Sequence, residues 1–278
     1  MVAEAHSLDS DSPVAEDSPA AEDSLPAQDS LPAGDSAVAD SAATRLAVVV
    51  PALNDDAALA RLLPLLARLA RAPEQVIVVD GAASAATAEL CRGAGCAWIP
   101  SARGRGVQLA AGIAAARTAG AGVVWMVHAD CEPHALSAHA IREALAAGAA
   151  GGYFRFRFGG ARSALKRFLE ACIAWRCRVS MVYGDQGIFV SRAAYDASPG
   201  IGPQPLFEEV ALVRALRRTG RFVALPLPMT VSERRWQRDG LLRRTLRNRT
   251  LAVAYLLGID PATLERWYRA PRAREARQ

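Results

Sequence analysis

Acids that directly follow apolar runs are the residues of this sequence best suited to chemistry. Asp130 ends the run VVWMVHAD, residues 123–130, in which five of the first six residues are apolar. Open α/β sheets bind their ligands where the strands end. A carboxylate at this point is therefore well placed to hold a divalent cation on a phosphate-bearing substrate. The alternative is an Asp that only caps the next helix.

Two further apolar runs also end in acids. Asp55 and Asp56 follow RLAVVVPALN, residues 45–54, and Asp80 ends QVIVVD, residues 75–80. Acids at three strand ends are more than helix capping would predict. If these ends share one crevice, the acids suit contacts to a ribose, a base edge and a metal.

The elements that must position these acids alternate between strand and helix. The patterns predict strands at 45–54, 75–80, 96–100 and 121–130, and helices at 55–72, 83–95, 104–120 and 133–148. This alternation predicts an α/β fold, in which a mostly parallel sheet carries helices on both faces. The first half therefore has a Rossmann-like, nucleotide-binding architecture.

The pattern changes beyond residue 150. We predict strands at 151–158, 187–191 and 222–232, and helices at 162–181, 206–220, 239–257 and 261–269. We expect this half to form the acceptor site. Asp185 and Gln186 lie here in the glycine-flanked turn YGDQG, where polar side chains suit contacts to an acceptor or a donor sugar. A plain turn is the competing interpretation.

Charge and composition narrow the class of protein. Ten of the 28 acids lie in residues 1–43, which contain no Lys or Arg and repeat short units rich in Ser and Pro. This segment is predicted to be a disordered acidic tail, and it lacks the pattern of a secretory signal. The rest carries 33 basic and 18 acidic residues, which favours anionic partners such as nucleotides, nucleic acids or membrane headgroups. Five cysteines without a CxxC pair, and no apolar run long enough to span a bilayer, predict a cytoplasmic protein.

A series of short motifs points to one family. Dinucleotide-binding enzymes place GxGxxG after the first strand, and the turn PALNDD has no glycine. Instead VVVPALNDD, VIVVDGAAS, GRGVQ, HAD, GDQG, FEEV and RRW follow one another in this order. With these motifs, residues 45 to about 269 resemble bacterial family 2 glycosyltransferases of the GT-A fold, and most of all their short single-domain subgroup. The predicted GT-A domain spans 44–272, with a nucleotide-binding half (44–150) and an acceptor half (151–272).

The resemblance implies inverting transfer of a sugar from a UDP or GDP sugar to an acceptor hydroxyl. Asp55 and Asp80 would hold the nucleoside, and Asp130 would bind Mg²⁺ or Mn²⁺ that bridges the diphosphate. Arg105 could contact the diphosphate through its planar guanidinium; the alternative is a solvated loop arginine. The family pattern assigns further donor contacts to Pro51, Asn54, Gly81, Gln108, Arg235 and Trp236.

Glu208 and Glu209 match the acidic pair of the family, whose second member is the catalytic base. Inversion requires a carboxylate opposite the leaving group, and we assign that role to Glu209. The alternative is an acid pair that only favours a helix N-terminus. The sequence departs from the family pattern at Ala85, at Ala110 and at His128, and its base is Glu rather than Asp. Because of these departures, an impaired or inactive enzyme remains an alternative.

Other classes of function remain as alternatives. One is a non-catalytic protein that binds nucleotide sugars. Another is a nucleotidyltransferase, although the basic Gly-rich loop of that class is absent after the first strand. No recognisable nucleic-acid-binding module is present. The arginines of the helix near the C-terminus, Arg243, Arg244, Arg247 and Arg249, lie among Leu and Val, which suggests a lipid-linked acceptor and peripheral contact with the inner face of the cell membrane. A core-packing helix with a solvated arginine face is the alternative.

Overall fold

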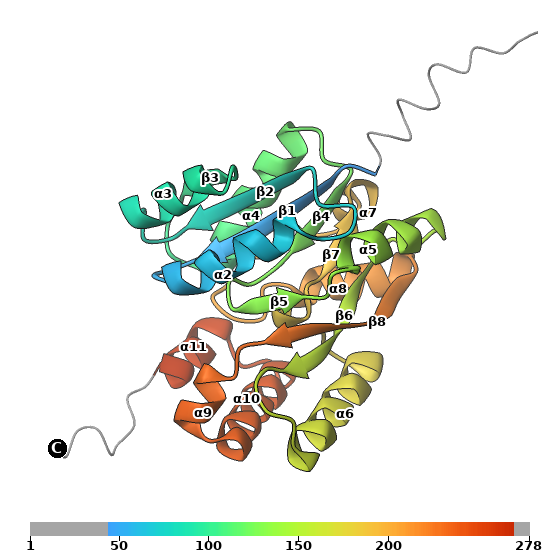
Figure 1. Cartoon of the computed structure of the whole chain (residues 1–278). Helices are drawn as coiled ribbons and strands as arrows, with labels where there is room; N and C mark the ends of the chain where they lie inside the picture. Colours follow the sequence, from blue (N-terminus) through green and yellow to red (C-terminus); the bar gives the residue numbers. More distant parts are fainter. Residues whose placement is uncertain (1–43, 270–278) are drawn as a thin grey trace, which may run out of the picture.

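The computed structural model describes residues 44–269 (Figure 1). The predicted acidic tail, residues 1–43, lies outside this range. The strands of the described part are β1 (Leu46–Ala52), β2 (Gln75–Asp80), β3 (Ala97–Pro100), β4 (Val123–Met126), β5 (Cys131–Pro133), β6 (Gly151–Phe158), β7 (Phe189–Ser191) and β8 (Phe222–Val231). Across residues 44–269 they form one eight-stranded sheet in the order β3-β2-β1-β4-β7-β6-β8-β5.

Helices cover both faces of this sheet. They are α2 (Asp56–Ala67), α3 (Ala85–Gly93), α4 (Arg105–Thr118), α5 (Ser137–Ala146), α6 (Ala164–Val179), α7 (Arg192–Asp196), α8 (Val210–Thr219), α9 (Arg234–Asp239), α10 (Leu241–Leu256) and α11 (Pro261–Arg269), with a 3₁₀ turn, η1, at Gly184–Gln186. Buried side chains form an apolar cluster on each face of the sheet. The predicted α/β class is confirmed.

The first half of the sheet creates the crevice that positions the site. β1 pairs in parallel with β2 on one side and with β4 on the other. The chain runs outward from β1 through β2 to β3 and then returns to β4, so the order reverses between β1 and β4. In open α/β sheets, ligands bind outside the carboxyl ends of strands at such a reversal. The loops that follow β1 and β4 therefore border the expected site.

Close packing of α4 fixes its position against these strands. A Cβ atom on Gly112 would lie 2.4 Å from Cγ1 of Val49 and 2.8 Å from Cγ2 of Val79. These distances are too short for carbon atoms, so only glycine allows α4 to lie this close to β1 and β2. Glycine at this position therefore sets the distance between α4 and the two strands.

The second half extends the sheet with mixed strand directions. β7 is antiparallel to β4 and β6, β8 is parallel to β6, and β5 is antiparallel to β8. The register between β6 and β8 shifts between Phe154 and Arg155. β5 was not predicted: β4 ends at Met126 rather than at residue 130, and residues 131–133 pair with β8. Asp130 therefore lies in a short connection between two strands that run in different parts of the sheet.

Several predicted helix limits were wrong. α2 ends at Ala67 rather than at 72, because the chain turns there and the guanidinium of Arg142 takes up the carbonyls of Arg71 and Ala72. α8 begins at Val210 rather than at 206. The predicted helix 239–257 is α10, and it is preceded by the separate helix α9 and the turn at Gly240 (φ 81°).

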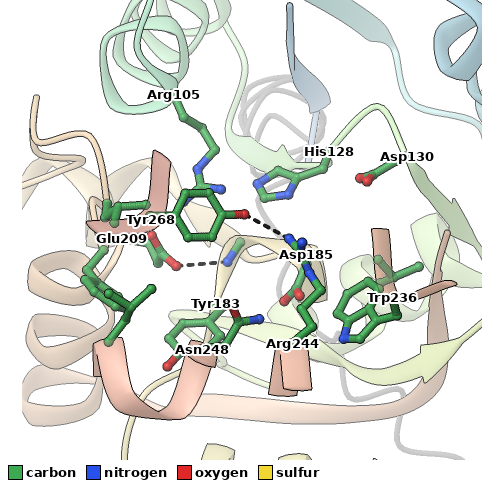
Figure 2. Close-up of a pocket in the computed structure, with 15 residues that line it drawn as sticks. Arg105, His128, Asp130, Tyr183, Asp185, Glu209, Trp236, Arg244, Asn248 and Tyr268 are labelled. Atoms are coloured by element: carbon green, nitrogen blue, oxygen red, sulfur yellow. Dashed lines mark hydrogen bonds between the residues drawn. The ribbon is translucent and has the colours of Figure 1, made fainter. Parts of the chain in front are cut away.

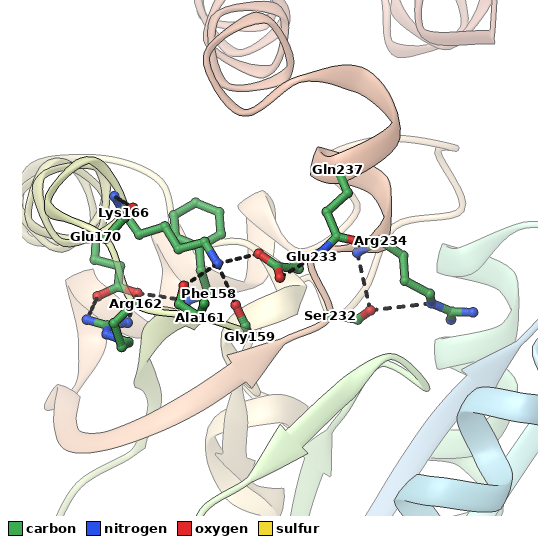
Figure 3. A network of polar contacts seen from close by, with 11 residues as sticks. Phe158, Gly159, Ala161, Arg162, Lys166, Glu170, Ser232, Glu233, Arg234 and Gln237 are labelled. Carbon is green, nitrogen blue, oxygen red and sulfur yellow. Dashed lines mark hydrogen bonds and ion pairs between the residues drawn. The ribbon is translucent and has the colours of Figure 1, made fainter.

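A polar network attaches α6 to the ends of β6 and β8 (Figure 3). Nζ of Lys166 donates to the carbonyls of Gly159 (2.9 Å) and Ala161 (2.7 Å) and forms an ion pair with Glu233. Glu170 accepts the backbone N–H of Phe158 at 2.8 Å and both terminal nitrogens of Arg162. Burial alone would raise the pKa of Glu170, but these hydrogen bonds outweigh it and lower the pKa. The network holds the first turns of α6 in a defined place beside the site.

Candidate active site

Residues from both halves of the sheet surround one cavity at the β1–β4 crevice, which we call the central cavity (Figure 2). Arg105 reaches it from the first turn of α4, and His128 and Asp130 from the loop after β4. Glu209 reaches it from the residue before α8, and Asp185 from η1. The structure therefore brings Asp130 and Glu209 to the same cavity, as the sequence analysis expected.

A second cavity lies beside the central one, on the side of β1, and we call it the donor-side cavity. Pro51, Asp55 and Gln108 line it, and Arg105, His128, Asp130, Leu206 and Tyr268 border both cavities. Asp55 and Glu209 thus belong to adjoining cavities that meet at Asp130. A long substrate with a nucleotide at one end and a reacting carbon at the other would suit this arrangement.

The acidic pair before α8 is almost fully buried. Glu208 has no exposed surface and Glu209 is 2% exposed. Glu208 forms a two-pronged ion pair with Arg105, in which Nη2 donates to Oε2 at 3.0 Å. Oε1 of Glu209 accepts the backbone N–H of Gly184 at 3.0 Å. Oε2 of Glu209 is buried and has no hydrogen-bond partner among the described residues, so it is available to accept a proton from a substrate.

Burial changes the acidity of this pair. Removal from water is the largest cause that raises the pKa of Glu209, the negative charge of Glu208 raises it further, and Arg105 opposes both; the result is a pKa of about 8. Burial alone would lower the pKa of Arg105, but the charge of Glu208, its hydrogen bonds with Arg105 and the charges of Glu209 and Asp185 together outweigh burial and raise the pKa. Glu208 is therefore held as an ion pair, whereas Glu209 is a carboxyl group whose pKa suits proton exchange near neutral pH.

Backbone strain lies directly before the acidic pair. Phe207 has a φ of 62°, a left-handed conformation that is uncommon for an aromatic residue. Its ring packs 4.6 Å from that of Tyr255 and 5.9 Å from that of Tyr183. Such strain persists where surrounding packing enforces it, often at functional sites. The turn at Phe207 starts α8 at Val210 and directs both acids inward.

The loop after β4 presents Asp130 at the meeting point of the cavities. The backbone of this loop is held by the N–H of Ser232, which donates to the carbonyl of Asp130 at 2.9 Å. A Cβ atom on Gly184 would lie only 2.7 Å from Nε2 of His128. The glycine of the YGDQG turn therefore allows η1 to lie directly against His128.

Asp80 and Gln108 have contacts that differ from the predicted ones. Asp80 is fully buried and lines neither cavity; its carboxylate accepts the N–H groups of Ala82 (2.8 Å) and Ser84 (2.7 Å). The amide of Gln108 donates to the carbonyls of Ala52 (2.6 Å) and Val79 (2.8 Å). These contacts fasten the ends of β1 and β2 to the loops that follow. They indicate a positioning role for Asp80 in place of the predicted contact to the donor, and a positioning role for Gln108 in addition to its place in the lining of the donor-side cavity.

Arg105 also differs from its predicted surroundings. It is neither a solvated loop arginine nor a free diphosphate ligand, because Glu208 takes two of its nitrogens. Gln186 is 1% exposed and bonds with Cys177 and the carbonyl of Phe154, so that it faces the interior rather than the central cavity. Asp185, its neighbour, does line the cavity.

Of the remaining residues predicted to contact the donor, one lines the central cavity and two line neither cavity. Trp236 lines the central cavity, where its ring packs edge-on against Phe158 at 5.3 Å. Asn54 (φ 55°) follows the end of β1, and Gly81 packs beneath the amide of Gln108; both lie outside the lining of the two cavities. The side chain of Arg235, in α9, lies outside those that the structure describes.

Several cavity residues were missed by the sequence analysis. They are Tyr183, Arg244, Asn248 and Tyr268. Arg244 was predicted to lie on a basic helix surface, but it is 7% exposed and donates to Asp239 at 2.6 Å and to the hydroxyl of Tyr268 at 2.8 Å. Tyr183 adjoins the GDQG motif, which could have identified it. The others depend on how α10 and α11 fold back over the site, for which the sequence offers no local signal.

Comparisons with known proteins agree with the motifs. Residues 47–176 match the family model for glycosyl transferase family 2. The fold resembles glucosyl-3-phosphoglycerate synthase from Mycobacterium tuberculosis. Its complex with Mn²⁺, UDP-glucose and phosphoglyceric acid is 20% identical, with a TM-score of 0.56, and the match covers 80% of this chain and 83% of that one. Its complex with Mn²⁺, UDP and glucosyl-3-phosphoglycerate is 20% identical, with a TM-score of 0.55 and the same coverage. No curated protein sequence matches the chain.

The family model thus matches the predicted family over residues 47–176, and the predicted GT-A fold is confirmed. The enzyme class of the chain is that of a glycosyltransferase. Among the described helices, none combines the length and the apolar character that crossing a bilayer requires.

Proposed function

We propose that this protein transfers a sugar, with inversion, from a UDP or GDP sugar to an acceptor hydroxyl, and that Glu209 is the catalytic base. The observation that carries the proposal is that Asp130 and the buried Glu209 line one cavity, with Glu209 at a pKa of about 8. A general base is most effective when its pKa lies near the working pH. The similar solved structures are complexes of a glucosyl-3-phosphoglycerate synthase with UDP-glucose and phosphoglyceric acid, or with UDP and glucosyl-3-phosphoglycerate, so that enzyme binds a nucleotide sugar and an acceptor together.

The donor set suits a cation that arrives with its substrate. Within residues 44–269 no cluster of three or more His, Cys, Asp and Glu side chains forms a cage for a metal. Mg²⁺ is usually bound by one or two carboxylates together with substrate phosphates, and Asp130 offers one carboxylate where the two cavities meet. Mg²⁺ or Mn²⁺ on Asp130 would supply Lewis-acid stabilisation of the leaving diphosphate. The similar solved complexes contain Mn²⁺ with UDP or UDP-glucose.

The residues of the chain divide the remaining work. Asp55 and Pro51 line the donor-side cavity, which we assign to the nucleoside. Oε2 of Glu209 accepts the proton of the acceptor hydroxyl as its oxygen bonds to the sugar carbon. The ion pair between Glu208 and Arg105 keeps both charges in fixed positions next to Glu209, and the N–H of Gly184 orients the carboxylate of Glu209. Asp185 and Trp236 border the space left for the sugar and acceptor.

A non-catalytic nucleotide-sugar-binding protein is the main alternative, because Ala85 and Ala110 stand where the family pattern has polar residues. A nucleotidyltransferase is the second alternative. Buried carboxyl groups with a raised pKa and an unbonded oxygen are typical of catalytic sites, so Glu209 favours the transferase over a protein that only binds.

The test is a panel of UDP and GDP sugars with and without Mn²⁺, read by nucleotide binding and by nucleotide release. We expect metal-dependent binding that is lost in Asp130→Asn, and turnover that is lost in Glu209→Gln while binding is kept. Glu89→Gln, on the exposed face of α3, is the matched control and should behave as wild type. Metal-dependent binding without turnover would favour the non-catalytic alternative, and release of pyrophosphate would favour the nucleotidyltransferase. Absence of both binding and turnover would refute the proposal.

A further inference from the structure

Helices α6 and α10 leave a long apolar hollow between them, which we call the α6–α10 groove. Its volume is about 590 Å³, against about 130 Å³ for the central cavity. α6 contributes Phe168, Cys172, Trp175 and Val179, and α10 contributes Ala252, Val253 and Leu256. The two helices lie below the sheet, next to each other (Figure 1).

The apolar side chains of the groove are unusually exposed. Phe168 is 64% exposed, Trp175 63%, Val179 61% and Val253 54%. On α6 the groove residues recur at intervals of four, three and four, so they form one stripe along the helix. A contiguous exposed apolar patch of this kind marks a site of interaction. Polar residues would otherwise occupy these positions on a solvent-facing helix.

The groove opens into the central cavity. Tyr183, Asp185, Trp236 and Asn248 line both. The shared end is polar and lies toward Glu209, whereas the lining away from it is mostly hydrocarbon and aromatic. The polar residues of that part are Arg176, Ser180, Thr245 and Arg249. An occupant that fits the whole space therefore has a polar head in the cavity and an apolar tail between the helices.

The segments outside the described residues do not fit this space. Residues 1–43 carry ten acids and only scattered Leu and Val, and residues 270–278 contain no Leu, Ile, Val, Met or aromatic residue. A second copy of the chain seated in the groove would cover the end that the groove shares with the central cavity. An amphiphilic small molecule satisfies both the apolar walls and the open polar end.

We propose that the acceptor is a lipid whose hydrocarbon chain lies in the α6–α10 groove and whose hydroxyl reaches Glu209. This inference rests on the proposed function. The acceptor oxygen forms a bond to the anomeric carbon of the sugar, the bond from that carbon to the diphosphate breaks, and the hydroxyl proton passes to Glu209. The groove selects for the chain, and the central cavity selects for the hydroxyl.

A long-chain alcohol with bromine at its far end, ω-bromoundecanol, tests this proposal. Bromine quenches indole fluorescence at short range, and Trp175 lies exposed in the groove. We expect saturable quenching in the wild-type protein, strongly reduced in Trp175→Phe. Val253→Asp places a charge in the apolar wall and should weaken the apparent affinity by about tenfold or more. Leu242→Asp, on the same helix and outside the groove lining, is the matched control and should change it less than about twofold.

The outcomes separate this proposal from the proposed function. No saturable quenching, or equal loss in Val253→Asp and Leu242→Asp, would overturn the groove as an acceptor site. A dimer seen by light scattering that Val253→Asp dissociates would overturn it in favour of a second copy. Mn²⁺-dependent UDP binding, measured in the same preparation, tests the proposed function independently. Quenching without such nucleotide binding would refute the proposed function, and the acceptor role with it.

Discussion

Replacing Glu208 by Gln should shift the pH dependence of transfer to lower pH. With a pKa of about 8, roughly a tenth of the Glu209 side chains are ionised at pH 7. The value of kcat/KM for the wild-type enzyme should therefore rise about tenfold from pH 7 and level off near pH 9. Glu208→Gln removes the like charge that raises the pKa of Glu209 and leaves the opposing charge of Arg105 in place.

The loss of the Glu208 charge and the charge of Arg105, now unopposed, both favour the ionised form of Glu209 and so lower its pKa. Nearby charges shift a carboxyl pKa by about one to three units, so we expect kcat/KM of the variant to level off at least one unit lower than in wild type. Its plateau should be lower, because a less basic carboxylate is a weaker proton acceptor. The variant would thus lose activity at pH 9 and lose less, or gain, at pH 6.

The assay is the initial rate of nucleotide release at low donor concentration between pH 5.5 and 9.5. Glu74→Gln is the matched control, because it breaks another ion pair between glutamate and arginine, in which Nη2 of Arg142 donates to both carboxylate oxygens, away from the site. It should leave the midpoint of the pH profile unchanged, and thermal unfolding of both variants shows whether the fold is kept. A wild-type profile that is flat from pH 6 to 9, or a Glu208→Gln midpoint equal to that of wild type, would refute the assignment of Glu209.

Three further outcomes test the structure. The pKa of Glu209 is raised on folding, so the folded state favours the protonated carboxyl group. Its contribution to stability is complete below about pH 4.5 and is lost as the pH rises to about 8. Chemical denaturation should therefore show Glu209→Gln gaining stability relative to wild type as the pH rises through that window. Asp80→Asn should lower the free energy of unfolding by about 1–3 kcal/mol, because backbone N–H groups of the next turn lose a charged acceptor; unchanged stability with weaker nucleotide binding would instead indicate a direct contact to the donor. Gly112→Ala should cost about 1–3 kcal/mol in thermal unfolding through overpacking against β1 and β2, and a neutral effect would show that α4 moves freely.

Much of the first half could be predicted because its signals are local. β2 coincides with its predicted limits, since a run of Val and Ile ends there in a single acid. The end of α2 was missed because it depends on Arg142, about seventy residues later in the chain, whose guanidinium binds the carbonyl of Arg71. β5 was missed for the same reason, since three residues become a strand only by pairing with β8.

The residues of the site also differ in whether local sequence or a distant contact decides their place. Asp130 and Glu209 could be identified from motifs, because the chemistry requires carboxylates at those positions and the sheet brings them together. Gln108 and Gln186 were assigned to substrates, but buried carbonyls and a thiol take up their amides. Arg244 was expected in solvent because a helix rich in arginine shows no local sign of which one turns inward. Hydrogen-bond partners distant in sequence decide these cases.

The network at the start of α6 gives the protein a natural reporter. Lys166 is the single lysine of the sequence, and its ammonium is held by two carbonyls and Glu233 with 10% of the side chain exposed. Acylating reagents that attack lysine amines would therefore leave this side chain nearly untouched while the helix stays attached. Mass spectrometry of one tryptic region would then measure how often α6 detaches, without any mutation.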